Sequence, residues 1–167
     1  TDIPELDRYK TVVVLMSDLD ALGKSLIDLM NWVQDGGSVL FAMTPQKTTY
    51  FDAISPKLGV LSSSWEYKTA ESIIPTEEFM LGGGQRYEIS DPFQSSLSVS
   101  LREEATVYAS TGDEGVPLVW GTKSGAGRVV VDNIGIYDKV MRGVYAASYS
   151  LLCDATAYPV INSAVFY

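Results

Sequence analysis

Thr11 to Thr44 reads TVVVLMSDLDALGKSLIDLMNWVQDGGSVLFAMT and contains the pattern of a strand, a helix and a second strand. The apolar, β-branched run from Thr11 to Met16 is typical of a strand buried on both faces of a parallel sheet. Apolar residues then recur at the spacing of one helix face, and Gly36 and Gly37 end that helix because glycine tolerates positive φ. The run from Ser38 to Met43 predicts a second buried strand. Two such strands joined by a helix form a right-handed βαβ unit.

The composition is that of an ordinary globular protein and excludes several classes of function. The 167 residues suit a single domain over the whole chain, with enough apolar residues for a core. No run approaches the roughly 20 apolar residues of a membrane helix, so we expect no membrane insertion by this segment. A net charge of −9 opposes binding to nucleic acid, whose phosphates favour Lys and Arg. The chain has no His, which removes the usual general base and the usual zinc ligand.

The middle of the chain is less regular than its beginning. A short helix is expected from about Gln46 to Ile54. Residues 60–104 are rich in serine, glycine and proline, which predicts an irregular elaboration with short strands, at one sheet edge or over the strand ends. A hairpin follows, with strands at Val116–Trp120 and Arg128–Asn133. Pro117 has no N–H for the sheet and therefore belongs near a strand start or on an edge.

The C-terminal part predicts a helix from about Asp138 to Asp154 and a strand from Tyr158 to Tyr167. Cys153 lies on the apolar side of that helix, and we expect it to be a buried packing residue. Because Tyr167 stands inside an apolar, β-rich run, we expect the sequence to be a fragment that continues into another domain.

Four motifs together carry a family resemblance: the strand at 12–16, the helix end NWVQDGG at 31–37, the strand at 38–43, and the hairpin VP…W…GAGRVVV at 116–131. They resemble the class I glutamine amidotransferase-like group of flavodoxin-like domains, and the hairpin is similar to trehalose-utilisation and β-galactosidase trimerisation members. The resemblance implies an α/β fold with three layers. It would have a mostly parallel, flavodoxin-like sheet, helices on both faces and a C-terminal β-hairpin at one edge.

The catalytic residues of active amidotransferases have no counterparts here. Those enzymes carry a nucleophilic Cys on the sharp turn after a strand, followed later by a His and a carboxylate. By order Thr44 stands at the position of that Cys, and the chain has no His to deprotonate it. Pro45 follows and has no N–H to offer an oxyanion. We therefore assign no catalytic residue, and the chain is not expected to be an enzyme.

A narrower resemblance comes from Tyr158–Tyr167. This segment looks like the one that joins such a domain to a polysaccharide-deacetylase-like domain in an uncharacterised bacterial family. It implies a non-catalytic accessory domain of a larger bacterial carbohydrate-active protein, used for interdomain packing or small-ligand sensing. The partner would be the adjacent domain of the same polypeptide. Two alternatives stay open: a carboxylate- and cation-dependent hydrolase acting on a carbohydrate, and an oligomerisation module.

The expected ligand site lies beyond the carboxyl ends of the parallel strands, near a topological switch point. Helix N-termini follow these strand ends, so free N–H groups favour an anionic or hydroxyl-rich molecule. We expect weak, non-covalent binding of a small polar or carbohydrate ligand, without a cofactor. The candidate ligand-binding residues are Ser17, Asp18, Thr44, Gln46, Asn133 and Tyr137.

Two further groups of residues have alternative interpretations. Carboxylates at the strand ends could hold a hard cation, but capping of the following helices explains most of them, so no metal ligand is assigned. Those carboxylates are Asp18, Asp20, Asp132 and Asp138. Two glycine clusters, Gly82–Gly84 and Gly125-Ala126-Gly127, could cradle an anion with backbone N–H groups. They are more simply explained as a flexible turn and the tip of the hairpin.

Overall fold

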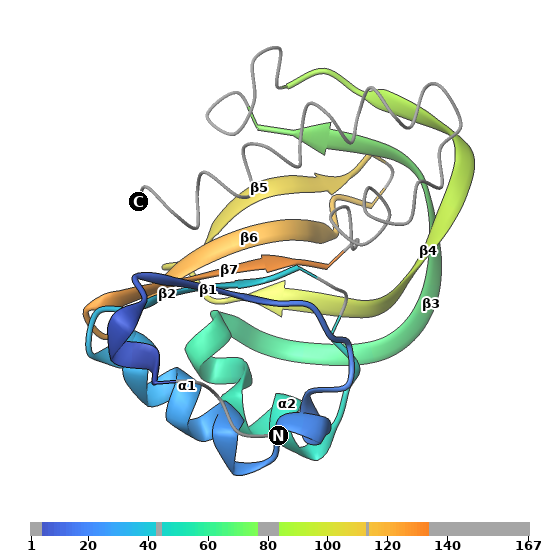
Figure 1. The fold of residues 1–167 in the computed structure, drawn as a ribbon. Helices are drawn as coiled ribbons and strands as arrows, with labels where there is room; N and C mark the ends of the chain where they lie inside the picture. Colours follow the sequence, from blue (N-terminus) through green and yellow to red (C-terminus); the bar gives the residue numbers. More distant parts are fainter. Residues whose placement is uncertain (1–4, 43–44, 77–83, 113, 134–167) are drawn as a thin grey trace.

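The computed structural model describes residues 5–42, 45–76, 84–112 and 114–133, which form one mixed sheet with its covering helices (Figure 1). The strand order is β1-β2-β7-β6-β5-β3-β4. Strands β1, β2 and β7 pair in parallel, and the other neighbouring strands pair antiparallel. The strands are β1 (Thr11–Val14), β2 (Ser38–Phe41), β3 (Val60–Pro75), β4 (Tyr87–Leu101), β5 (Thr106–Thr111), β6 (Pro117–Ser124) and β7 (Gly127–Asp132).

Two α-helices of the described residues, α1 (Lys24–Gln34) and α2 (Thr49–Ile54), cover the same face of the sheet (Figure 1). Helix α1 buries one apolar stripe, because its large apolar side chains recur every three or four residues. Helix α2 begins after Thr48, whose hydroxyl accepts a hydrogen bond from the Phe51 N–H at 3.3 Å. Three short 3₁₀ turns accompany them, η1 (Leu6–Arg8), η2 (Leu19–Leu22) and η3 (Ser55–Leu58).

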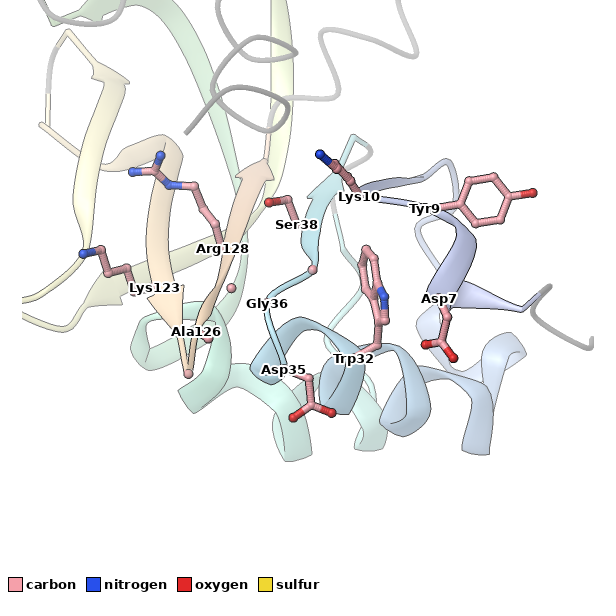
Figure 2. Close-up of a pocket in the computed structure, with 13 residues that line it drawn as sticks. Asp7, Tyr9, Lys10, Trp32, Asp35, Gly36, Ser38, Lys123, Ala126 and Arg128 are labelled. Carbon is pink, nitrogen blue, oxygen red and sulfur yellow. The ribbon is translucent and has the colours of Figure 1, made fainter.

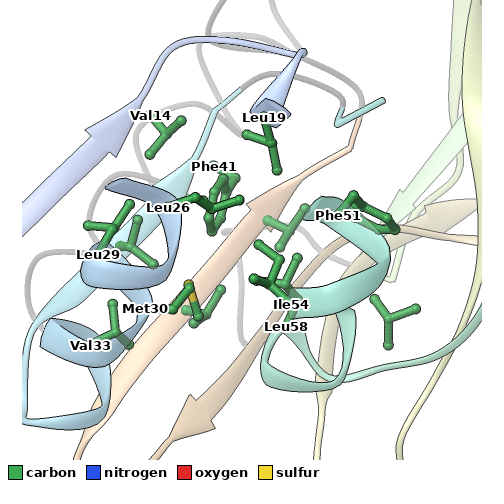
Figure 3. Close-up of a cluster of buried hydrophobic side chains, with 14 of the residues drawn as sticks. Val14, Leu19, Leu26, Leu29, Met30, Val33, Phe41, Phe51, Ile54 and Leu58 are labelled. Carbon is green, nitrogen blue, oxygen red and sulfur yellow. The ribbon is translucent and has the colours of Figure 1, made fainter. Parts of the chain in front are cut away.

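The core lies between these helices and the sheet (Figure 3). Leu26, Leu29, Met30 and Val33 of α1 meet residues of α2, η3 and the sheet in one buried cluster, including Phe41, Phe51, Ile54, Leu58 and Trp120. Trp120 is fully buried, and its indole N–H donates to the Leu58 carbonyl at 2.8 Å. This bond fixes η3 to β6 and pairs the only polar group of that large buried side chain.

Two predictions from the sequence are confirmed. Strands β1 and β2 are parallel neighbours joined through α1, with Thr11 opposite Ser38, so the βαβ unit is present. Strands β6 and β7 form the expected hairpin, with Lys123 opposite Arg128. Pro117 is the first residue of β6, where its missing N–H costs the sheet no interior hydrogen bond.

The predicted three-layer flavodoxin-like fold, mostly parallel and with helices on both faces, is wrong. Only two strand pairings of the described sheet, β1 with β2 and β2 with β7, are parallel, and both described α-helices lie on one face. The hairpin is also not at an edge, because β7 pairs with β2 on one side and β6 on the other. The sheet changes from parallel to antiparallel at β7, and four more strands follow in the antiparallel part.

The main source of the error is the segment from 60 to 104. Its sequence predicts an irregular elaboration, yet it forms the two long paired strands β3 and β4 at the end of the sheet. Serines lie opposite each other along this pair, Ser62 with Ser100 and Ser64 with Ser98, while Leu97 and Val99 are buried. An antiparallel strand with one apolar face and one serine face contains many turn-forming residues, so its sequence resembles a loop.

The predicted helix at 138–154, Cys153 and the strand at 158–167 lie outside the described residues. Among the residues that the structure describes, no helix has the length and hydropathy needed to cross a membrane.

Candidate functional site

A groove of about 810 Å³ lies at the amino ends of the parallel strands, beside the C-terminal end of α1 (Figure 2). Its walls come from the residues before β1, the end of α1, the start of β2 and the turn between β6 and β7. This is the end of the sheet opposite to the one where the sequence predicted a ligand. Its volume falls within the range of about 300–1,000 Å³ typical of small-molecule sites.

Strand register places cations along one side of the groove. Ser38 lies opposite Arg128 on the parallel neighbour, and Arg128 lies opposite Lys123 across the hairpin. Side chains of directly opposite residues project to the same face of a sheet, so Ser38, Arg128 and Lys123 form a row. Lys10 precedes β1 at the end of this row, and Figure 2 shows the residues in the order Lys123, Arg128, Ser38 and Lys10. We call Lys10, Lys123 and Arg128 the basic rim.

Carboxylates lie on the other side of the groove. Asp7 belongs to η1 and Asp35 is the residue that caps the C-terminal end of α1, and both are exposed. Figure 2 shows them on the helix side, away from the basic rim. The C-terminal end of a helix also carries partial negative charge. The groove therefore has positive groups on its sheet side and negative groups on its helix side.

The turn between β6 and β7 forms the floor of the groove by closing onto the end of α1. The Ala126 N–H donates to the Gln34 carbonyl at 2.9 Å, and the Arg128 N–H donates to the Gly37 carbonyl at 3.1 Å. A Cβ on Gly127 would overlap the carbonyl oxygens of Val33 and Gly37, so only glycine permits this approach. We call these contacts the turn–helix clamp.

The clamp decides between the two interpretations of Gly125-Ala126-Gly127. The Ala126 N–H is already bonded to the last turn of α1, whose carbonyls otherwise lack partners within the helix. The three residues form the tip of the hairpin rather than an anion cradle. The other glycine cluster, Gly82–Gly84, lies mostly outside the described residues.

Trp32 forms the wall of the groove between α1 and β2 (Figure 2). A Cβ on Gly37 would lie 2.5 Å from the carbons of its indole ring, so Gly37 lets the backbone of β2 pass directly against the ring. Trp32 is partly buried and packs against the core cluster. The wall is therefore apolar and held in place by packing.

The candidate residues predicted from the sequence are only partly brought together. The Gln46 N–H donates to the Ser17 carbonyl at 2.9 Å, so these two residues meet through their backbones. Asp18 accepts from the Asp20 N–H at 3.0 Å and caps η2. Asn133 is fully buried, and its side-chain amide donates to the Leu97 carbonyl at 2.8 Å. Thr44 and Tyr137 lie outside the described residues. Ligand binding at this end of the sheet stays a prediction.

The carboxylates that could have been cation ligands make different contacts and do not form one cluster in the described residues. Asp18 caps η2, and Asp20 accepts from the Tyr50 N–H at 3.1 Å. Asp132 is buried at the end of β7, whereas Asp138 lies outside the described residues. In the described part of the chain, no three metal-ligating side chains gather closely enough to hold an ion.

The prediction from the sequence did not identify the basic rim. Lys123 and Arg128 flank the hairpin turn at equal distance, so a register counted from the turn would have placed them opposite each other. The contribution of Lys10 and Ser38 could not be found in this way, because it depends on β2 lying beside β7.

The sequence matches a known family over its full length. The family described as "Uncharacterised protein conserved in bacteria (DUF2194)" matches residues 1–96 and 88–167. The chain belongs to this family. A search of curated protein sequences gives no match to this DUF2194 chain.

Solved structures with a similar fold include glycosidases. An exo-β-1,4-mannosidase from Opitutaceae bacterium strain TAV5 matches with a TM-score of 0.59 and 20% identity, over 98% of this chain and 26% of that chain. A β-galactosidase from Bacillus circulans sp. alkalophilus matches with a TM-score of 0.54 and 15% identity, over 84% and 24%. A cytoplasmic protein from Salmonella typhimurium LT2 gives a TM-score of 0.58 and 12% identity, over 95% and 73%.

These similarities concern the fold alone, since the identities are low. The DUF2194 chain spans about a quarter of the length of the mannosidase and the galactosidase. The expected glutamine amidotransferase-like, flavodoxin-like assignment is corrected by the strand-rich mixed sheet and by these glycosidase-like neighbours.

Proposed function

We propose that this DUF2194 chain is a non-catalytic accessory module of a larger bacterial carbohydrate-active protein, and that it packs against another part of its own polypeptide. One observation carries this proposal. Almost the whole chain, 98%, superposes on only 26% of a mannosidase, so a module of this shape occurs there as one portion of a carbohydrate-active enzyme. The resemblance of Tyr158–Tyr167 to a segment before a polysaccharide-deacetylase-like domain makes such a domain the expected neighbour.

The composition of the chain supports a non-catalytic role. A chain without His lacks the most common general base at neutral pH, and other side chains would have to take that role. The polar residues expected at the strand ends, Asp18 and Asn133, make structural hydrogen bonds to a neighbouring turn and to β4. Their side chains stabilise the fold in the positions where a catalytic group would have to face a substrate.

The surface proposed for packing is at β1. Val13 and Leu15 are 42% and 52% exposed, although both are large apolar residues. They stand two positions apart, so they project to the same side of the chain, and β1 is the last strand at this end of the described sheet. Exposed neighbouring apolar side chains are a common sign of an interaction surface. The occupant we infer is the remainder of the same polypeptide.

Hydrogen exchange tests the packing. We expect amides of residues 9–16 to exchange more slowly in the full-length polypeptide than in the isolated chain. A full-length variant with Val13→Asp and Leu15→Asp should lose that difference, whereas Leu61→Asp, an exposed leucine on β3, should keep it. Equal exchange of residues 9–16 in both proteins would refute the packing.

Turnover tests the non-catalytic role. The isolated chain is expected to leave nitrophenyl mannosides, nitrophenyl galactosides and acetylated oligosaccharides unchanged. Hydrolysis of any of them that disappears when a single carboxylate is replaced by its amide would show that the chain is an enzyme. A stable trimer in sedimentation, with residues 9–16 protected in the isolated chain, would instead favour the oligomerisation module.

A further inference from the structure

The outer edge of β1 carries main-chain groups that pair with no other strand of the described sheet. On the inner side, the Lys10 and Val14 carbonyls accept hydrogen bonds at 3.0 and 3.1 Å from N–H groups at the start of β2 and directly after its end. Main-chain groups of successive strand residues point to opposite sides. Those of Thr11 and Val13 therefore point away from β2, toward the outside of the sheet.

The side chains of β1 divide into a buried face and an exposed face. Val14 is buried and belongs to the core cluster, whereas Val13 and Leu15 are exposed apolar side chains. A further strand beside β1 would place its own side chains next to Val13, because directly opposite residues of paired strands share a face of the sheet. The exposed apolar side chains thus lie where an added strand would cover them.

The two outer strands of the described sheet differ in their protection against pairing. Strand β4, at the far end, contains Asp91 and Pro92, and its pairing with β3 has three register shifts. Charged residues, proline and bulges are features by which edge strands avoid pairing with other chains. Strand β1 has the sequence TVVV, with neither a charged residue nor proline, and its register with β2 is regular. The edge at β1 therefore lacks the features that oppose pairing at β4.

We propose that the remainder of the polypeptide adds a β-strand to the outer edge of β1, so that the sheet continues into the neighbouring part of the protein. This inference rests on the proposed function, from which it takes the occupant, and it adds main-chain pairing as the mode of contact. The apolar edge runs from Thr11 to Met16, between the charged residues Lys10 and Asp18, and is roughly 20 Å long. The partner is an extended segment of about six residues with apolar side chains at alternate positions.

Hydrogen exchange at single-residue resolution separates strand addition from contact of side chains alone. The Val12 and Val14 N–H groups point to β2 and should exchange slowly in the isolated chain and in the full-length polypeptide. The Thr11 and Val13 N–H groups point outward. Each should exchange at least about tenfold more slowly in the full-length polypeptide, because exchange of a paired amide requires local opening. Unchanged exchange of Thr11 and Val13 would overturn strand addition.

Two substitutions of one residue test the main-chain contact directly. Val13→Pro removes the outward N–H, whereas the control Val13→Ala keeps it and shortens the side chain. Proline is tolerated on an edge strand where the N–H faces solvent, so the isolated Val13→Pro chain should keep its fold. In the full-length polypeptide, Val13→Pro should abolish the protection of Thr11, and Val13→Ala should retain it. Equal loss in both variants would overturn strand addition. If Val13→Pro unfolds the isolated chain, exchange of Thr11 and Val13 in the unsubstituted polypeptide still decides.

The outcomes are separable from those of the proposed function. If other amides of residues 9–16 are protected in the full-length polypeptide while Thr11 and Val13 exchange as in the isolated chain, strand addition is wrong and the packing stands. If all of residues 9–16 exchange equally fast in both proteins, both proposals are wrong. If Thr11 and Val13 are already protected in the isolated chain, the assignment to the remainder of the polypeptide is wrong. Loss of that protection on dilution would identify a second copy of the chain as the occupant.

Discussion

Gly127→Ala is the most direct test of the turn–helix clamp. The added methyl group would overlap the carbonyl oxygens of Val33 and Gly37, which belong to backbone held by α1 and β2. The overlap is relieved only if the turn moves away from the helix. That movement would stretch the two bonds of the clamp, from Ala126 to Gln34 and from Arg128 to Gly37.

The expected destabilisation follows from these contacts. Each of the two hydrogen bonds contributes about 0.5–1.5 kcal/mol, and overpacking costs about 1–3 kcal/mol. Replacing glycine by alanine also lowers the conformational entropy of the unfolded chain, and this stabilises the folded state by up to about 1 kcal/mol. Together these ranges span about 1–6 kcal/mol, and we expect the free energy of unfolding to fall by a value near the middle, about 2–4 kcal/mol. A chain of this size would then melt roughly 4–16 °C lower.

Urea unfolding followed by circular dichroism measures this change, and Gly115→Ala is the matched control. Gly115 has a φ of 65°, and no atom lies within 4 Å of the position that a Cβ would occupy, so alanine there meets only backbone strain of about 1 kcal/mol. Gly127→Ala should be clearly the less stable variant. If it unfolds within about 0.5 kcal/mol of the unsubstituted chain, the clamp is not closed in solution and the groove has a different floor.

Three further substitutions test the core and the strand ends by the same urea unfolding. Trp120→Phe removes the donor to the Leu58 carbonyl and should cost about 2–3 kcal/mol; a cost below about 1 kcal/mol would mean that the buried carbonyl finds another donor. Asn133→Ala removes the bond to the Leu97 carbonyl and should cost about 1–3 kcal/mol, whereas unchanged stability would favour a role in ligand binding. Thr48→Ala removes the hydroxyl cap of α2 and should cost about 1 kcal/mol, while Thr48→Ser keeps a hydroxyl and should stay close to the unsubstituted chain; equal losses would argue against the cap.

The parts of the fold that could be predicted from the sequence are those fixed by local pattern. Leu26, Leu29, Met30 and Val33 repeat at helical spacing, so α1 could be recognised without its neighbours. Pro117 and the glycines of the β6–β7 turn mark the ends of the hairpin by their own backbone preferences. These signals require no knowledge of which strands lie side by side.

The order of the strands could not be predicted in this way. Nothing local in Ser38–Phe41 indicates that β2 pairs with β7, or that β7 then pairs antiparallel with β6. Strand β4 was not recognised from its sequence, because its serine face contains the same polar residues that occur in loops. The groove was missed for the same reason as the strand order, since its walls come together only once β1, β2 and β7 are neighbours.

The pairing of β2 with β7 also has a kinetic consequence. Ser38 and Arg128 are neighbours in the sheet although on the order of 90 residues separate them in the chain, and closing such a loop costs about 4 kcal/mol of entropy beyond a fixed constant. The two halves that β2 and β7 join are each built from nearer contacts, β1 to β2 and β5 to β7. Each half can therefore form before β2 pairs with β7. The late, rate-limiting event would be their docking along a single parallel seam, which predicts folding in the slow range of milliseconds to seconds.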